Sequence, residues 1–202
     1  MADILISENS GFCFGVRRAV EIALKEGQKG GKTYTLGPII HNSNVVDYLK
    51  THGVSAVSSI SELDSDSVVI IRSHGVPASI IHELKERKMK FIDATCPYVS
   101  KIHRIVREWA SEGYQIIIIG KPDHPEVLGI SGQCDTALVF ADEIGLEEFL
   151  KSHEEMREKP ICMVAQTTIE KEIFIKCEKI LKKCCTNYKI FDTICRATSK
   201  RQ

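Results

Sequence analysis

Two of the eight cysteines in this chain end the same short motif, in which an aspartate is followed three residues later by a cysteine. The motif occurs at 93–96 (DATC) and at 192–195 (DTIC), and each copy follows an apolar run typical of a strand. A glycine followed four residues later by a histidine precedes each copy, at 37–41 and at 120–124. Repetition in the same order predicts duplicated structural units. Because the repeated positions hold a thiol and an imidazole, the duplication concerns chemistry as well as scaffold.

A third cysteine, Cys13, lies in the segment 11–15 (GFCFG) after the first predicted strand, in a position equivalent to those of Cys96 and Cys195. Three thiolates can hold a 4Fe–4S cluster with one iron open to substrate, or zinc with an open fourth position. A free cysteine can also be a plain buried residue, but three equivalent positions favour a metal site. The remaining cysteines are interpreted as core or undecided positions without a second metal site: Cys134, Cys162, Cys177, Cys184 and Cys185.

Three histidines, His41, His74 and His124, each lie just past the carboxyl end of a predicted strand. Beside helix N-termini they could bind a diphosphate, as charged or neutral donors. Each could instead be a structural histidine whose hydrogen bonds are satisfied. The other histidines are assigned that structural role: His52, His82, His103 and His153.

Glu126 and Thr167 are candidates for proton delivery. Near an apolar cavity the pKa of Glu126 would rise enough for the carboxyl group to supply protons, although an acid in the first turn of a helix is a common alternative. Thr167 could relay a proton or hold a water molecule, and its alternative is the N-cap of the following helix.

The elements that must position these residues alternate between strands and helices. Predicted strands are 4–6, 33–36, 54–57, 68–71, 91–93, 115–119, 137–140, 161–165 and 189–191, and predicted helices include 16–25, 44–50, 79–87, 98–111, 146–151 and 171–185. Runs of Ile and Val without polar alternation indicate parallel sheets covered on both faces, hence an α/β fold. Ligands bind at the carboxyl ends of such strands. The groups expected there, facing one shared cavity, are Cys13, His41, His74, Cys96, His124, Thr167 and Cys195.

The composition narrows the class of protein. Of the 202 residues 43% are hydrophobic, which excludes a disordered chain, and the formal net charge is zero. A chain without clustered positive charge is not expected to bind nucleic acid or an acidic membrane. Its longest apolar runs, such as 116–119, are too short to span a bilayer, and the N-terminus lacks the basic region of a signal peptide. The sequence therefore predicts a soluble, cytoplasmic protein whose cysteines are not paired in disulfides.

The ordered motifs closely resemble, from end to end, those of the 4-hydroxy-3-methylbut-2-enyl diphosphate reductase family: 11–16 (GFCFGV), 37–42 (GPIIHN), 72–76 (RSHGV), 93–97 (DATCP), 124–126 (HPE), 166–168 (QTT) and 193–198 (TICRAT). The resemblance implies the last step of non-mevalonate isoprenoid synthesis, the methylerythritol phosphate pathway. Two electrons from ferredoxin or flavodoxin and two protons expel water from the allylic diphosphate substrate. The products are isopentenyl and dimethylallyl diphosphate.

The resemblance also implies roles for the candidate residues. A 4Fe–4S cluster is held by the three cysteines, Cys13, Cys96 and Cys195, and its open iron binds the hydroxyl group of the substrate. The implied substrate-binding residues are His41, His74, His124 and Thr167, and the implied catalytic residues are Glu126, Thr167 and His124.

The implied fold is a trefoil-type arrangement of parallel-sheet α/β lobes around a central cavity. Its expected parts are an N-terminal strand and first cysteine loop (1–13), a first lobe (14–96), a second lobe (97–193) and the start of a third (194–202). Family members continue for roughly another lobe of about 100 residues, so we expect the third lobe to be mostly missing. A complementing C-terminal lobe is therefore an expected partner.

Two other hypotheses stay open. In one, Cys13, Cys96 and Cys195 hold zinc in a hydrolase with Glu126 as its base. In the other, the chain is a truncated or split fragment without activity of its own. The identity of the metal separates the first from a reductase. The retained histidines and Glu126 argue against a remnant, because a remnant has no physical need for them.

Overall fold

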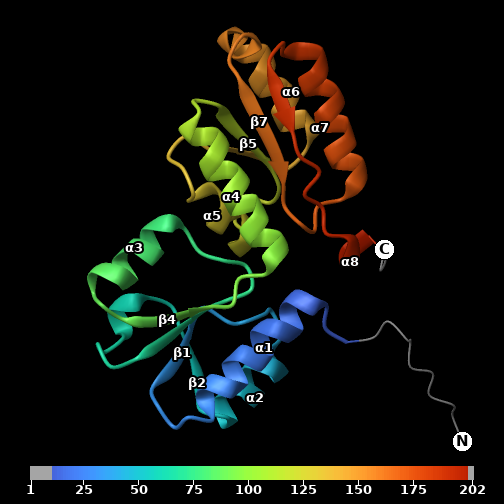
Figure 1. Cartoon of the computed structure of the whole chain (residues 1–202). Coiled ribbons are helices and arrows are strands. Elements are labelled where there is room, and N and C mark those ends of the chain that lie inside the picture. The colour runs from blue at the N-terminus through green and yellow to red at the C-terminus, as the bar shows by residue number, and fades with distance from the viewer. Residues whose placement is uncertain (1–10, 200–202) are drawn as a thin grey trace, which may run out of the picture.

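The computed structural model describes residues 11–199, which form two lobes, one above the other in Figure 1. The strand predicted at 4–6 lies outside the described residues. Each lobe is a four-stranded parallel sheet with helices on both faces. The predicted α/β class with parallel sheets is confirmed.

The two sheets share one strand order. The first has the order β2-β1-β3-β4 and the second β6-β5-β7-β8. Their strands are β1 (Thr33–Leu36), β2 (Val54–Val57), β3 (Val68–Ile71), β4 (Lys90–Asp93), β5 (Gln115–Ile119), β6 (Leu138–Phe140), β7 (Ile161–Ala165) and β8 (Tyr188–Ile190). In the first sheet Thr33 pairs with both Val54 and Val68, and in the second Gln115 pairs with Ile161. The motif repeat in the sequence thus corresponds to a repeat of strand topology.

Alternate strand residues face opposite layers of helices, as the pleat of a strand requires. The helices are α1 (Phe14–Gly27), α2 (Ser43–Thr51), α3 (Ala78–Glu86), α4 (Pro97–Ser111), α5 (Pro125–Ser131), α6 (Glu143–Ser152), α7 (Lys171–Cys184) and α8 (Arg196–Ser199). In the first lobe Ile70 packs toward α1 and α2, whereas Ile71 packs toward α3. In the second lobe Ile118 packs toward α4 and α5, and Ile119 toward α6 and α7. The apolar runs are therefore buried on both faces, which explains their lack of polar alternation.

Most predicted elements match the structure to within a few residues. The strand predicted at 189–191 lies one residue earlier, at Tyr188–Ile190, and each predicted helix differs by at most three residues at either end. The helix α5 was not among the predicted helices. It has only seven residues, too few to show a helical period, and it begins at Pro125, whose ring suits the first turn.

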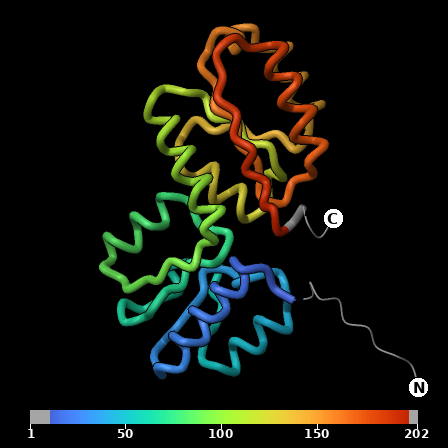
Figure 2. The backbone as a smooth tube through the Cα atoms, turned by 45° about the vertical axis from the view of Figure 1, so that its right-hand side comes forward, coloured from blue at the N-terminus to red at the C-terminus, as the bar shows by residue number. Residues whose placement is uncertain are grey.

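The lobes are joined where α5 packs on the loop after β3. The Ala78 N–H donates to the Gly132 carbonyl oxygen at 2.9 Å, and a Cβ at Gly132 would lie 2.4 Å from the Cβ of Pro77. Only glycine permits this approach. Figures 1 and 2 show α8 returning to the boundary between the lobes, beside the start of α1. Within residues 11–199 no helix is both long and apolar enough to cross a membrane.

Candidate active site

Each sheet has one point at which the chain changes the direction in which it adds strands. In the first sheet this point lies between β1 and β3, and in the second between β5 and β7. Sheets of this kind bind ligands there, outside the carboxyl ends of the strands. His41 and His74 follow β1 and β3. His124 and Thr167 follow β5 and β7.

The structure brings the three candidate histidines into one cluster. Their ring centroids lie 5.3 Å (His41 and His74), 5.6 Å (His74 and His124) and 6.1 Å (His41 and His124) apart. One nitrogen from each ring lies within 4.8 Å of the others. His124 is also the N-cap of α5, because its Nδ1 accepts the Glu126 N–H at 3.1 Å. The three side chains can thus contact one small ligand together.

Arg72 lies beside this cluster and makes it a site for an anion. Its guanidinium packs over Gly37, where a Cβ would lie 2.7 Å from the terminal nitrogen, and φ at Gly37 is +73°. Among the described residues the side chain has no ion-pair partner, and its buried Nε has no hydrogen-bond partner. Burial lowers its pKa, but an arginine stays charged in proteins. A fixed positive charge beside three imidazoles disfavours a metal cation there and favours an anionic group.

Burial and the neighbouring positive charges disfavour protonation of His74 and His124. The pKa of His74 is lowered to about 3 by burial, by Arg72 and by the other two histidines. That of His124 is lowered by burial, by His41 and by Arg72. An anion would reverse these shifts, because it favours the protonated rings. A diphosphate in the cluster would therefore favour protonation of His74 and His124.

The three candidate cysteines lie around a cavity next to the histidine cluster. Cys13 and Cys96 are the N-cap residues of α1 and α4, and Cys195 directly precedes α8. All three line one cavity of about 280 Å³, together with His74, Glu126 and Thr167. Cys13 and Cys96 thus lie at helix N-termini, where the free backbone N–H groups point.

The surroundings of these cysteines fit a multinuclear metal group. A Cβ at Gly15 would lie 2.4 Å from the Cys96 sulfur, so the glycine leaves that sulfur free to face the cavity. Burial raises the pKa of the Cys96 thiol, and the nearby Cys13 and Cys195 raise it further, against the backbone N–H groups of Tyr98 and Val99. Bound cations would remove this penalty, since a coordinating thiol is deprotonated outright. The thiols and the clearance at Gly15 are what a Cys₃-bound cluster requires.

Glu126 and Thr167 form a buried pair at the edge of the same cavity. The Thr167 N–H donates to Oε1 of Glu126 at 2.6 Å, and the Thr167 hydroxyl donates to Oε2 at 2.7 Å. The two residues are 4% and 6% exposed. Burial raises the pKa of Glu126, while the two bonds from Thr167 oppose the rise. A carboxyl group with a raised pKa, bonded to a hydroxyl at a cavity wall, can hold and pass a proton.

Backbone hydrogen bonds tie the cysteines to the other site loops. The Cys96 N–H donates to the Ser73 carbonyl oxygen, and the Cys195 N–H donates to that of Thr167, both at 2.9 Å. Lys121 N–H donates to the Gln166 side chain at 3.0 Å and so joins the loops after β5 and β7. A displacement of either cysteine is therefore transmitted directly to His74 or to the proton pair.

Every candidate site residue proposed from the sequence lies in the cysteine cavity or in the histidine cluster beside it: Cys13, His41, His74, Cys96, His124, Glu126, Thr167 and Cys195. Their roles stay predictions. The alternative for Thr167, an N-cap, is wrong, because Glu170 precedes α7 and Thr167 binds Glu126. His103 was assigned a satisfied structural role, which is also wrong, since its buried Nε2 has no partner within the described part of the chain. Arg72 was missed, although a charged residue directly after a buried strand could have indicated it.

The chain matches the family model described as LytB protein over residues 4–202. The chain belongs to the LytB family. Relatives of this LytB chain carry the name 4-hydroxy-3-methylbut-2-enyl diphosphate reductase. One from Alkaliphilus oremlandii (strain OhILAs) is 43% identical and covers 98% of this chain and 70% of its own length. One from Clostridioides difficile (strain 630) is 41% identical and covers 99% of this chain and 71% of its own length.

Solved structures agree with this LytB assignment. A structure of (E)-4-hydroxy-3-methyl-but-2-enyl diphosphate reductase, the terminal enzyme of the non-mevalonate pathway, superposes with a TM-score of 0.83 at 40% identity, over 100% of this chain and 71% of that one. The structure of the E-1-hydroxy-2-methyl-but-2-enyl-4-diphosphate reductase from Plasmodium falciparum superposes with a TM-score of 0.84 at 29% identity, over 95% of this chain and 60% of that one. The resemblance predicted from the sequence motifs is confirmed.

Proposed function

We propose that this LytB chain binds a 4Fe–4S cluster and uses it to reduce 4-hydroxy-3-methylbut-2-enyl diphosphate to isopentenyl and dimethylallyl diphosphate. The observation that carries the proposal is the composition of one cavity. Three cysteines from distant segments line it together with the Glu126–Thr167 pair, and the histidine cluster adjoins it. Thiolates, proton donors and an anion site are the parts that a reductive removal of hydroxide from a diphosphate ester requires.

Cys13, Cys96 and Cys195 would hold the cluster. When bound, it supplies electrons and an open iron that acts as a Lewis acid toward a hydroxyl group. The electrons come from a donor protein such as ferredoxin or flavodoxin. The first turn of α4 contributes the backbone N–H groups of Tyr98 and Val99, which favour the Cys96 thiolate.

The diphosphate of the substrate would lie in the histidine cluster. Arg72 provides the fixed charge, and His41, His74 and His124 provide ring N–H donors. The anion favours the protonated forms of His74 and His124. Charge-assisted bonds from four side chains fix one end of the substrate. The other end, with the hydroxyl group, is then directed toward the cysteine cavity that His74 also lines.

Glu126 and Thr167 would supply protons at the other wall. The reaction breaks one C–O bond, and two protons and two electrons are consumed. One proton leaves with the hydroxyl group as water, and the other is added to carbon. Burial raises the pKa of Glu126, which favours the protonated carboxyl group that this step requires. The Thr167 hydroxyl, 2.7 Å from Oε2, lines the same cavity and can relay a proton from the carboxyl group.

The decisive experiment measures iron and acid-labile sulfide per chain after anaerobic reconstitution. We expect about four of each in the unaltered chain. Cys13→Ser, Cys96→Ser and Cys195→Ser should each lose most of both, while Cys134→Ser, a half-buried cysteine outside the cavity, should lose none. Zinc in place of iron would favour the hydrolase hypothesis, and no bound metal would reject both.

A further inference from the structure

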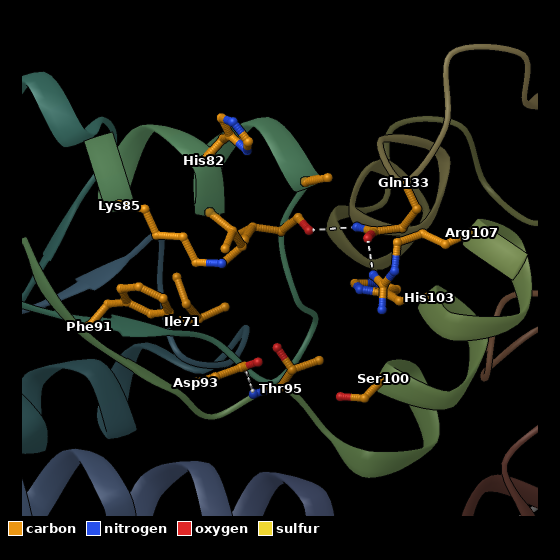
Figure 3. A pocket seen from close by; sticks show the side chains of 13 residues that line it. Ile71, His82, Lys85, Phe91, Asp93, Thr95, Ser100, His103, Arg107 and Gln133 are labelled. Atoms are coloured by element: carbon orange, nitrogen blue, oxygen red, sulfur yellow. Dashed lines mark hydrogen bonds between the residues drawn. The ribbon is translucent and has the colours of Figure 1, made fainter. Parts of the chain in front are cut away.

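A second cavity, of about 530 Å³, lies between the two lobes and shares no lining residue with the cysteine cavity (Figure 3). The first lobe contributes β3, β4, α3 and the loops after both strands. The second contributes α4 and Gln133. Its volume is in the range of small-molecule sites.

The walls combine positive charge with apolar surface. Lys85 and Arg107 lie on opposite sides of the cavity in Figure 3. Among the described residues the Lys85 side chain has no hydrogen-bond or ion-pair partner, and the Arg107 side chain bonds only to that of Gln133. Ile71, Val76 and Phe91 provide the apolar part. Arginine has five N–H donors, so Arg107 can bind a further oxygen while it holds Gln133.

The polar side chains Asp93 and His103 in the cavity lining differ in their hydrogen bonds. Asp93 is the one acid of the lining, and its Oδ1 accepts the Thr95 N–H at 2.8 Å. His103 is 7% exposed, and its Nε2 has no hydrogen-bond partner within residues 11–199. Burial and Arg107 lower the pKa of His103 to about 4, while Asp93 opposes the shift, so the ring is neutral near neutral pH. An orphaned buried nitrogen costs free energy that a ligand or water can recover.

We propose that this interlobe cavity binds a small organic phosphate, with the phosphate between Lys85 and Arg107 and a compact apolar body against Ile71 and Phe91. Phosphate fits better than carboxylate, because three acceptor oxygens can meet donors from opposite walls at once. A hydroxyl group on the body can donate to the free oxygen of Asp93. The binding site does not depend on the reductase reaction.

The same cavity adjoins the active-site loops from behind. A Cβ at Gly75 would lie 2.5 Å from Cε1 of His103 and 3.2 Å from the methyl group of Thr95, so the three residues are in close contact. Gly75 follows His74, and Thr95 precedes Cys96. A ligand that changes the position of His103 would therefore also shift the loops that carry His74 and Cys96. By linkage, occupancy of either site changes the affinity of the other by the same factor.

Histidine-resolved NMR tests the proposal on the whole chain, with phenyl phosphate as the probe. Each imidazole signal is assigned by a His→Gln variant, so that binding between the lobes (His103) is separated from binding at the cluster (His41, His74 and His124). We expect the His103 signal to shift and saturate. Lys85→Gln should weaken this binding about tenfold or more, as expected for one charge-assisted hydrogen bond. Lys179→Gln, an exposed lysine on α7, is the matched control and should change nothing.

Two further arms test the chemistry of the ligand. Inorganic phosphate should bind more weakly than phenyl phosphate, because it leaves Ile71 and Phe91 uncovered. Benzyl alcohol, which has the apolar body without the charge, should not shift the His103 signal. A shift confined to the three cluster histidines, or equal affinities in Lys85→Gln and the unaltered chain, would overturn the site. Equal affinities for the two phosphates would overturn the organic part of the proposal.

Discussion

Replacing Thr167 with valine removes one of the two hydrogen bonds to the buried Glu126 carboxyl group at almost constant volume. The hydroxyl bond of 2.7 Å is lost, whereas the 2.6 Å bond from the backbone N–H remains. A hydrogen bond to a charged group contributes about 1.5–3 kcal/mol. The hydroxyl bond lowers the pKa of Glu126 against the effect of burial, so we expect that pKa to rise further in the variant.

The sign of the stability change follows from that direction. An acid whose folded-state pKa lies above its unfolded value stabilises the fold fully below the unfolded pKa, and the contribution is lost as pH rises through the folded pKa. The valine variant deepens this loss, because the ionised carboxylate retains only one donor. The free energy of unfolding should fall by about 1.5–3 kcal/mol near pH 8. Near pH 4, where Glu126 is protonated, the fall should be only about 0.5–1.5 kcal/mol.

Thr193→Val is the matched control. The Thr193 hydroxyl is buried as well, but its partners are neutral: it donates to the Ala165 carbonyl oxygen at 2.6 Å and accepts the Ala165 N–H at 2.8 Å. Its loss should cost about 1–3 kcal/mol at both pH values, since no charge is involved.

Urea unfolding at the two pH values, together with a ¹³C NMR titration of the labelled Glu126 carboxyl group, measures both quantities. The reasoning would be refuted if Thr167→Val lost the same free energy at both pH values, as Thr193→Val should. It would also be refuted if the pKa of Glu126 fell in the variant.

Two further predictions concern the metal and anion sites. Gly15→Ala should lower the iron content after reconstitution although no ligand is removed, because its Cβ would lie 2.4 Å from the Cys96 sulfur; the melting temperature should hardly fall, since alanine favours the helix by about 1 kcal/mol, and full iron content would contradict the prediction. Arg72→Gln should weaken the binding of inorganic pyrophosphate, measured by calorimetry, about tenfold or more. It should also raise the pKa of His74 in an NMR titration, because a neighbouring positive charge is removed. Lys121→Gln, an exposed lysine near His124, is its control and should have a smaller effect.

Much of the fold could be predicted because the strands carry their own signal. The run at 116–119 is buried on both faces, and such runs are apolar at every position. The meeting of His41, His74 and His124 also follows from their positions at strand ends, since parallel strands bring their carboxyl ends to one edge.

The parts that could not be predicted depend on contacts between distant segments. His103 lies on an amphipathic helix, and nothing near it in sequence indicates that Gly75 packs against its ring. Nor does the local sequence indicate that its Nε2 lacks a partner within residues 11–199. The role of Thr167 required knowing that Glu126, 41 residues earlier, lies within hydrogen-bond distance. Arg72 differs, because its signal was present but ambiguous. A charged residue after a strand is usually solvated, and only the structure shows it half-buried over Gly37.

The shared strand order has a consequence for how the protein is made. Each sheet consists of four consecutive strands, so each lobe can fold as a unit, although pairing parallel strands across an intervening helix makes that folding slow. During synthesis the first lobe can fold before β8 has been made. The cavity walls come from both lobes, however, and exist only after α5 has docked on the loop that carries His74. The three cavity cysteines are therefore brought together only after both lobes have folded.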